Sequence, residues 1–180
     1  LCRYLHTPLQ SGSDEILHNM NRRYTLREFD EFINLVHDLV PGICLGTDVI
    51  VGFPGETDAH FEQTYQNLLN ADLAYFHVFS YSERPWTKSR KLEAKVSPEI
   101  IEQRSRRLRE LSDRKRRIYL QGQLGTIQTV LFEQIKKGYW TGLTDTYVRV
   151  KVKSNNNLQN QVLPVQMESI EKNTIIGKLL

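Results

Sequence analysis

The chain has 180 residues, a formal net charge of +3 and 39% hydrophobic residues. This length suits one complete domain, or part of a larger domain followed by a small one, and no apolar run approaches the length of a transmembrane helix. The two cysteines, Cys2 and Cys44, are too few for a disulfide framework and lack other ligands at metal-binding spacing, which favours a reducing, cytoplasmic setting. Because Leu1 opens directly into strand-like sequence, we interpret the chain as a piece of a longer polypeptide.

Strand and helix patterns alternate through the first half of the chain. Apolar runs typical of strands occupy residues 4–9, 43–51 and 73–81, and helical patterns begin near residues 14, 25 and 58. The helix over residues 25–40 starts with a Thr25–Glu28 capping box. Strands that alternate with helices at this spacing predict an α/β fold with a parallel sheet and right-handed crossovers.

The stretch from Thr47 to Thr57 is the most informative part of the sequence. A buried strand with one carboxylate, Asp48, ends in Gly52, where another group can approach the backbone. Pro54 and Gly55 suit the centre of a type II turn. In α/β proteins ligands lie outside the carboxyl ends of the strands, so this loop is a candidate binding site, although the same pattern also fits a purely structural turn.

A long basic helix is expected after Ser97. Between residues 98 and 117 it carries 8 Arg or Lys and 4 Asp or Glu, a net charge of +4. Its apolar positions form a thin seam that is expected to dock the helix and leave the arginines in solvent; they are Ile101, Leu108, Leu111 and Ile118. Such a face either contacts phosphates or is simply solvated.

The remaining residues predict a small all-β module. Strand-like runs occupy residues 127–132, 146–152, 162–167 and 174–179, and no helical period survives there. We expect an OB-like barrel with a domain boundary near residue 120.

Five stretches together resemble the radical-SAM methylthiotransferases. They are Pro8–Asp14 (PLQSGSD), Met20–Thr25 (MNRRYT), Thr47–Thr57 (TDVIVGFPGET), His77–Pro85 (HVFSYSERP) and Gly142–Val150 (GLTDTYVRV). The resemblance implies that residues 1–120 form the C-terminal part of a partial (β/α) radical-SAM barrel plus a connecting basic helix over 97–120. It implies that residues 121–180 form a TRAM-like RNA-binding β-barrel.

The resemblance also implies cofactors. The family cleaves S-adenosylmethionine with one 4Fe-4S cluster and takes sulfur from a second. Cluster ligation needs closely spaced thiolates, which Cys2 and Cys44 do not supply, so both clusters are expected outside this chain and the chain is expected to be inactive alone.

Seven residues are expected to bind S-adenosylmethionine. Ile50 and Gly52 match the loose Gly-x-Ile-x-Gly pattern of such barrels, whereas Asp48 stands where that pattern has its first Gly and is a candidate for holding ribose, substrate or an arginine. The other four lie at the ends of the neighbouring strands; they are Gln10, Ser11, Phe79 and Tyr81. For each, capping, core packing or backbone bonding is the structural alternative.

Six residues are expected to bind substrate. Arg22, Arg23 and Arg84 lie in loops on the same rim, and Tyr147, Arg149 and Lys151 lie in the β-module. His6 and His77 are expected to face the barrel interior. The histidines show no metal spacing in the sequence, and no residue is assigned to catalysis or to a metal.

The motifs are most similar to the branch of the family that modifies threonylcarbamoyladenosine in tRNA, with the anticodon stem-loop as partner. The alternatives are the branch that acts on a ribosomal protein and a non-catalytic RNA-binding module derived from such an enzyme.

Overall fold

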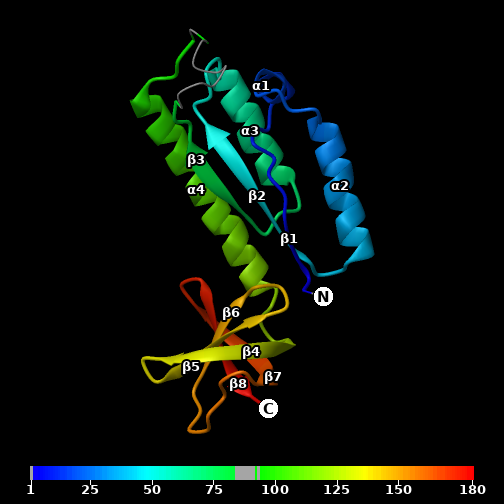
Figure 1. Ribbon diagram of the computed structural model, residues 1–180, viewed down its shortest axis with the longest axis vertical. Coiled ribbons are helices and arrows are strands. Elements are labelled where there is room, and N and C mark those ends of the chain that lie inside the picture. The colour runs from blue at the N-terminus through cyan, green and yellow to red at the C-terminus, as the bar shows by residue number, and fades with distance from the viewer. Residues whose placement is uncertain (1, 84–91, 93) are drawn as a thin grey trace. The chain divides into compact units, whose positions relative to one another are not determined.

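The structure is a computed structural model that describes residues 2–83, 92 and 94–180. The chain forms two compact units (Figure 1). The sheet unit comprises Leu5–Pro41 and Leu45–Lys115, and the barrel unit comprises Leu1–Tyr4, Gly42–Cys44 and Arg116–Leu180. Among the described helices, none combines the length and the apolar character that crossing a membrane requires.

The sheet unit is built on three strands in the order β1-β2-β3. The strands are β1 (Tyr4–His6), β2 (Cys44–Val51) and β3 (Tyr75–Ser80), and the helices are α1 (Asp14–Asn19), α2 (Leu26–Leu39), α3 (Asp58–Asn70) and α4 (Pro98–Gln121). β2 and β3 are parallel. The predicted α/β fold with a parallel sheet is therefore confirmed.

Local sequence explains where α2 and α3 begin. Thr25 accepts from the backbone of Glu28, and Thr57 accepts from the backbone of His60; in each pair the second side chain returns a bond to the capping residue's backbone. The capping box predicted at Thr25 is thus present. Gly55 has a φ of +89°, which fits the positive φ expected of it in the turn after β2.

One face of the sheet is packed against α3, which lies behind the strands in Figure 1, and α4 runs beside β3. Alternate β2 residues are fully buried there, as expected for period-two strands; they are Leu45, Thr47, Val49 and Val51. Ser112 of α4 donates to the carbonyl of Phe76 at 2.6 Å and accepts from its amide at 2.9 Å. The helix thereby satisfies backbone groups at the outer edge of β3.

Gly52 is the point of closest approach between β2 and α4. Its φ is +80°, and a Cβ added there would lie 2.3 Å from Cγ1 of Ile101. The group that the sequence predicted to approach this backbone is therefore the Ile101 side chain.

A buried ion pair fastens α4 to the loop after β2. Arg104 is only 5% exposed; its guanidinium donates to Glu56 at 2.5 Å and to Asp58 at 2.6 Å. Burial raises the pKa of Glu56, and the bond from Arg104 opposes that rise. The prediction that the arginines of this helix lie in solvent is wrong for Arg104, because sequence periodicity does not reveal a buried carboxylate on a neighbouring loop. The prediction that Ile118 belongs to the apolar seam that docks the helix is also wrong, because Ile118 is 60% exposed.

The barrel unit contains five strands that close in the order β4-β5-β6-β8-β7. They are β4 (Ile127–Lys136), β5 (Tyr139–Thr144), β6 (Arg149–Val152), β7 (Val162–Glu171) and β8 (Thr174–Leu179). Only the β6–β8 pair among them is parallel. Its core is apolar and includes Val130, Phe132, Val150, Val165 and Ile175. The predicted small β-barrel is confirmed.

Strand β5 is absent from the sequence prediction. Lys137 and Gly138, both at positive φ, form a tight hairpin turn between β4 and β5. Gly142 then lies in mid-strand, where a Cβ would come within 2.3 Å of the Leu131 carbonyl oxygen. This glycine suggests a break in the sequence, whereas the structure uses it for close packing between strands.

Replacing Arg104 with Ala should lower the free energy of unfolding by about 3–5 kcal/mol, because the partner carboxylate would stay buried without its cation. Arg106→Ala is the matched control, since the Arg106 side chain is 67% exposed and reaches Glu102 only at 4.0 Å. That control should change stability by less than about 0.5 kcal/mol. Urea unfolding measures both, and equal losses in the two variants would contradict a structural role for the buried pair.

Gly52→Ala should destabilise the fold more than Gly55→Ala does. Both substitutions place alanine at positive φ, but only at Gly52 would the added Cβ meet another atom within 4 Å. Adding Ile101→Ala should recover part of the loss caused by Gly52→Ala and none of the loss caused by Gly55→Ala. A double-mutant cycle from urea unfolding measures this coupling, and additive effects at Gly52 and Ile101 would contradict the packing argument.

Candidate functional site on the open face of the sheet

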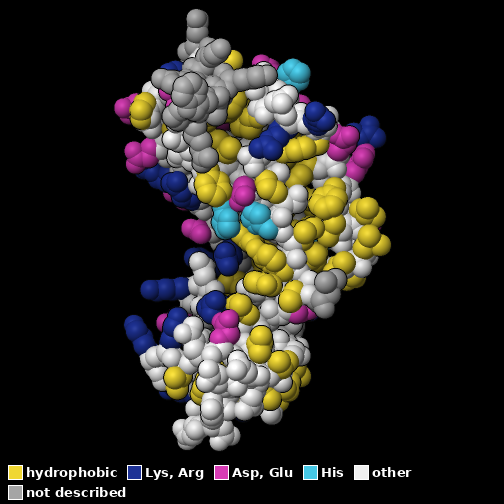
Figure 2. Space-filling model, viewed as in Figure 1, with side chains coloured by type: hydrophobic (Ala, Val, Ile, Leu, Met, Phe, Trp, Pro, Cys, Tyr) yellow, Lys and Arg dark blue, Asp and Glu magenta, His cyan; other side chains and the backbone are white. Residues whose placement is uncertain are grey.

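One face of the sheet carries polar and aromatic side chains. The β2–β3 register sets Gly46 beside Tyr75, Asp48 beside His77 and Ile50 beside Phe79. Because side chains alternate along a strand, these residues share one face, opposite to the buried one. We call this surface the open face. Figure 2 shows histidine and acidic side chains together on it, with hydrophobic side chains around them.

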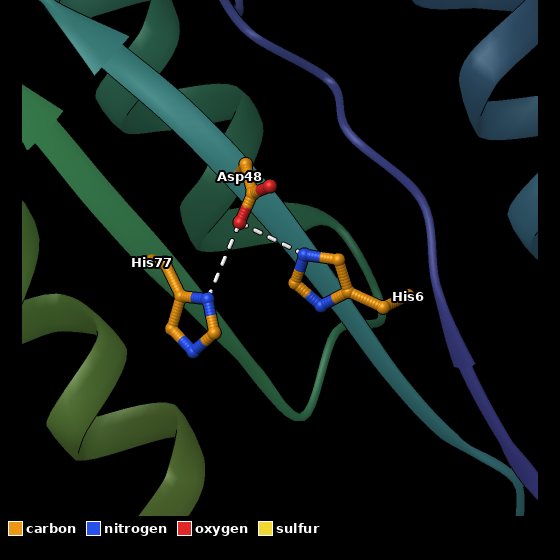
Figure 3. A group of neighbouring side chains, drawn as sticks. All are labelled: His6, Asp48 and His77. Atoms are coloured by element: carbon orange, nitrogen blue, oxygen red, sulfur yellow. Dashed lines mark hydrogen bonds and ion pairs between the residues drawn. The ribbon is translucent and has the colours of Figure 1, made fainter.

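Asp48 and His77 form one cluster of close polar contacts with His6 of β1 (Figure 3). A single oxygen of Asp48, Oδ1, lies 2.8 Å from Nε2 of His6 and 3.3 Å from Nδ1 of His77. The two imidazole rings stack with centroids 5.2 Å apart. Nδ1 of His6 lies 3.3 Å from the Tyr75 hydroxyl, which extends the network by one residue. We call His6, Asp48 and His77 the His-Asp-His cluster.

The cluster explains the carboxylate in an apolar strand. Asp48 and His6 each keep 23% of their side chains exposed, whereas His77 keeps 55%. Asp48 is thus paired with two imidazoles and partly hydrated, which removes most of the cost of placing it there. His6 and His77 thus share a face with Asp48; that this face is the interior of a barrel stays a prediction. The pairing itself could not be predicted, because the sequence does not contain the strand register.

The ligand atoms of the cluster lie within 4.8 Å of one another, close enough to hold a metal ion. Among the residues that the structure describes, no other group of three His, Cys, Asp or Glu side chains does so. Sequence spacing missed this group, because its members come from three different strands.

The cysteines do not fit an iron-sulfur cluster. Cys2 is exposed and Cys44 is buried. Burial raises the pKa of Cys44 to about 11, so its thiol stays protonated at neutral pH, whereas cluster ligands are thiolates.

The other predicted cofactor residues differ in how they are presented. Ile50 and Phe79 lie on the open face, and Phe79 is 51% exposed. The backbone of Gln10, at a φ of +74°, bonds to β2 through its N–H to Asp48 and its carbonyl to Ile50, both at 2.8 Å. Tyr81 meets Phe53 edge-on at 5.4 Å.

Two of the predicted cofactor residues serve the fold in this structure. Ser11 is buried, and its hydroxyl accepts from the Ser13 amide at 3.3 Å. The space beside Gly52 is occupied by the Ile101 side chain, and the Gly52 amide donates to the Glu56 carboxylate at 3.2 Å.

The predicted substrate residues of the sheet unit lie after α1. Arg22 and Arg23 are exposed in the turn that follows Asn21, which has a φ of +58°. Arg84 lies outside the described residues.

The predicted substrate residues of the barrel unit are on its surface and already hold partners. Tyr147 stacks on Tyr4 with ring centroids 4.5 Å apart. Arg149 pairs with Glu133 at 3.3 Å, and Lys151 pairs with Glu171.

Two lysines flank one aromatic ring on the barrel. The ammonium groups of Lys151 and Lys153 lie 5.1 and 5.3 Å from the centroid of Tyr139. This combination of an aromatic ring with cations is typical of surfaces that bind single-stranded nucleic acid.

Comparison with known proteins places these features in a family. The sequence profile of the Radical SAM superfamily matches residues 2–68. Threonylcarbamoyladenosine tRNA methylthiotransferase MtaB from Aquifex aeolicus is 38% identical over 149 residues, covering 82% of this chain and 35% of the relative. The tRNA-2-methylthio-N(6)-dimethylallyladenosine synthase from Lawsonia intracellularis is 34% identical, covering 100% of this chain and 41% of the relative. MtaB from Bacillus subtilis is 31% identical, covering 93% of this chain and 38% of the relative.

Among solved structures, coproporphyrinogen III oxidase (HemN) from Escherichia coli, a radical SAM enzyme, aligns with 99% of this chain and 46% of its own. The TM-score is 0.48 and the identity 12%, a likeness that by itself establishes neither fold nor function.

The chain spans about two fifths of the length of the curated relatives it matches. The aligned regions nevertheless cover 82% to 100% of the chain itself. Together with the superfamily match over β1 to α3, they confirm the predicted resemblance: the chain belongs to the radical-SAM methylthiotransferase family.

Proposed function

We propose that the chain is part of an enzyme that adds a methylthio group to threonylcarbamoyladenosine beside the anticodon of tRNA. The observation that carries this proposal is that relatives named as tRNA methylthiotransferases align along nearly all of the chain. Among the similar relatives, two are named for threonylcarbamoyladenosine and three for dimethylallyladenosine. The choice between these nucleosides therefore rests on the residues of the site.

The open face suits part of an S-adenosylmethionine chamber. Ile50 and the exposed ring of Phe79 offer apolar surface to an adenine ring, and the polar His-Asp-His cluster lies next to them on the same sheet. When bound, S-adenosylmethionine supplies the radical that abstracts hydrogen and the methyl group that is transferred. The residues of this chain would orient it and its substrate. The iron-sulfur clusters do not fit the two cysteines, so we assign no step of theirs to this chain.

The barrel suits RNA binding through its surface cations. Lys151 and Lys153 beside Tyr139 offer phosphate contacts and a stacking surface, and Arg149 lies on the same strand as Lys151. The carboxylates of Glu133 and Glu171 hold two of these cations at the surface. Exposed ion pairs are worth about 0–1 kcal/mol, so a phosphate can replace the carboxylate at little cost.

The activity is tested with the full-length enzyme after reconstitution of its clusters. It is given S-adenosylmethionine, a reductant and, in separate reactions, tRNA containing threonylcarbamoyladenosine or purified ribosomal proteins. Mass spectrometry of digested RNA and protein should find the methylthio group on the adenosine alone. Transfer to a ribosomal protein would favour the alternative branch, and no transfer with intact RNA binding would favour a binding module.

Removing the barrel lysines should weaken tRNA binding and its salt dependence together. For the pair Lys151→Ala and Lys153→Ala, the slope of log affinity against log salt should fall by about 0.7–0.9 per lost phosphate contact. Filter binding of the full-length protein at several salt concentrations measures the slope. Lys178→Ala, an exposed lysine on β8 that is not beside Tyr139, is the control and should change the slope less.

Glu171→Gln tests the same surface in the opposite direction. It removes the carboxylate that holds Lys151 without removing the lysine, so tRNA affinity should rise at low salt. Unchanged affinity in both Glu171→Gln and the lysine variants would contradict RNA binding by this side of the barrel.

A further inference from the structure

The His-Asp-His cluster is not explained by the fold. Its three side chains stay partly exposed on the open face, while the core of the sheet unit lies on the other side of the strands. A cluster of two imidazoles and a carboxylate adds little stability at such a surface. The arrangement of these groups is instead suited to recognising a ligand.

The shared oxygen fixes which ring nitrogens remain for a ligand. Oδ1 of Asp48 lies 2.8 Å from Nε2 of His6 and 3.3 Å from Nδ1 of His77. A carboxylate only accepts hydrogen bonds, so the tautomers that suit this contact carry their protons on these two nitrogens. The second nitrogen of His6 lies beside the Tyr75 hydroxyl. Among the described residues, nothing hydrogen-bonds the second nitrogen of His77, Nε2. A neutral ring offers this atom as an acceptor, and a protonated ring offers it as a donor.

His77 also borders a hollow of about 370 Å³ along the outer edge of β3. The hollow is lined by β3 residues and by one face of α4; they are Phe76, His77, Val78, Phe79, Arg109, Ser112 and Asp113. Its size is at the lower end of small-molecule sites. It combines an exposed aromatic ring, an imidazole and a guanidinium, groups that bind apolar, hydrogen-bonding and anionic parts of a ligand respectively. It also holds one carboxylate, Asp113, four residues after Arg109 on α4.

We propose that this hollow binds the N6 substituent of the substrate adenosine and that His77 and Arg109 make it specific for a carbamoylated amino acid. His77, oriented by Asp48, hydrogen-bonds the carbamoyl or hydroxyl group, and Arg109 pairs with the carboxylate. His6 holds Asp48 from the other side. The proposal rests on the proposed function and deepens it, because it names the groups that distinguish threonylcarbamoyladenosine from dimethylallyladenosine.

The chemistry of the two substituents gives the direction of the discrimination. A dimethylallyl group has no hydrogen-bonding atoms. Its binding would remove the hydrogen bonds that His77 and Arg109 make to water without replacing them. A fully buried site built to hydrogen-bond its substrate rejects an analogue without the bonding group by up to about 10⁴–10⁵ in kcat/KM. Because His77 is more than half exposed, we expect about 10- to 100-fold here.

The experiment uses full-length, cluster-reconstituted enzyme and two tRNAs that differ only in threonylcarbamoyl or dimethylallyl at the target adenosine. Two quantities are measured for each: kcat/KM for methylthio transfer, and the dissociation constant of the matching anticodon stem-loop. Wild type should prefer the threonylcarbamoyl RNA in both. His77→Ala and Arg109→Ala should each lower that preference about 10-fold or more, mainly through the threonylcarbamoyl RNA.

Conservative variants and a control separate recognition from misfolding. His77→Gln places an amide near the position of Nε2 and should keep part of the preference, and Arg109→Lys should keep part of the carboxylate contact. His37→Ala is the control, because His37 is a partly buried histidine that contacts Asp72 and lies outside the hollow. It should leave the preference unchanged.

The outcomes that overturn the proposal are distinct from failure of the proposed function. If wild type modifies neither RNA, the proposed function fails. If wild type modifies the threonylcarbamoyl RNA and His77→Ala leaves the ratio of the two substrates unchanged, the specificity proposal is overturned. Equal loss on both RNAs with loss of S-adenosylmethionine cleavage would assign His77 to the cofactor. Loss of a stoichiometric additional metal ion from the variants would assign the cluster to that metal; either result overturns the proposal.

Discussion

The parallel register of β2 and β3 is the constraint on which the candidate site depends. It sets Asp48 beside His77, and a slip of one residue would replace His77 with a side chain from the opposite face of β3. This register requires a glycine at position 46, because a Cβ there would lie 2.5 Å from the ring of Tyr75. The buried β2 residues specify the same alignment from the helix-covered face, since a slip would expose them. The polar cluster is thus positioned by apolar packing behind it.

Helix α4 holds that alignment in place rather than serving only as a charged surface. Ile101 fits over Gly52, Arg104 bonds to Glu56, and Ser112 satisfies the edge of β3. Arg107 lies over the rings of Phe61 and Tyr65, and so it also packs against α3. The charge count of the helix therefore overstates the number of cations available to RNA. Arg109 is notable because it lines the hollow beside His77, on the same helix as these anchoring residues.

The sequence predicted what depends on local pattern, and it missed what depends on distant partners. The alternation of strand and helix patterns predicted the α/β fold, and the capping box predicted a helix that starts after Thr25. The β-rich runs and the family motifs predicted the small barrel. The apolar strand around Asp48 predicted that this carboxylate needs a partner. The partners of Asp48 could not be predicted, because they come from strands separated by 42 and 29 residues whose register is a tertiary property. The buried position of Arg104 could not be predicted for the same reason, because its partner Glu56 lies on a distant loop. β5 was not predicted, because Gly142 interrupts the apolar pattern typical of a strand. The structure needs a glycine there because the neighbouring strand packs too closely for a Cβ.

On the proposed function, the two units supply different parts of RNA recognition. Arg149 and Lys151 of the barrel face carboxylates at the surface, which phosphates can replace at little cost. Such phosphate contacts add affinity and carry no information about the base. The open face holds fewer charges, but one carboxylate oxygen there orients two imidazole rings. The helix that brings Arg109 to the neighbouring hollow is fastened by a buried ion pair. Groups fixed before binding lose little freedom when a ligand arrives. Affinity that depends on salt should therefore come from the barrel, and discrimination between nucleosides should come from the open face.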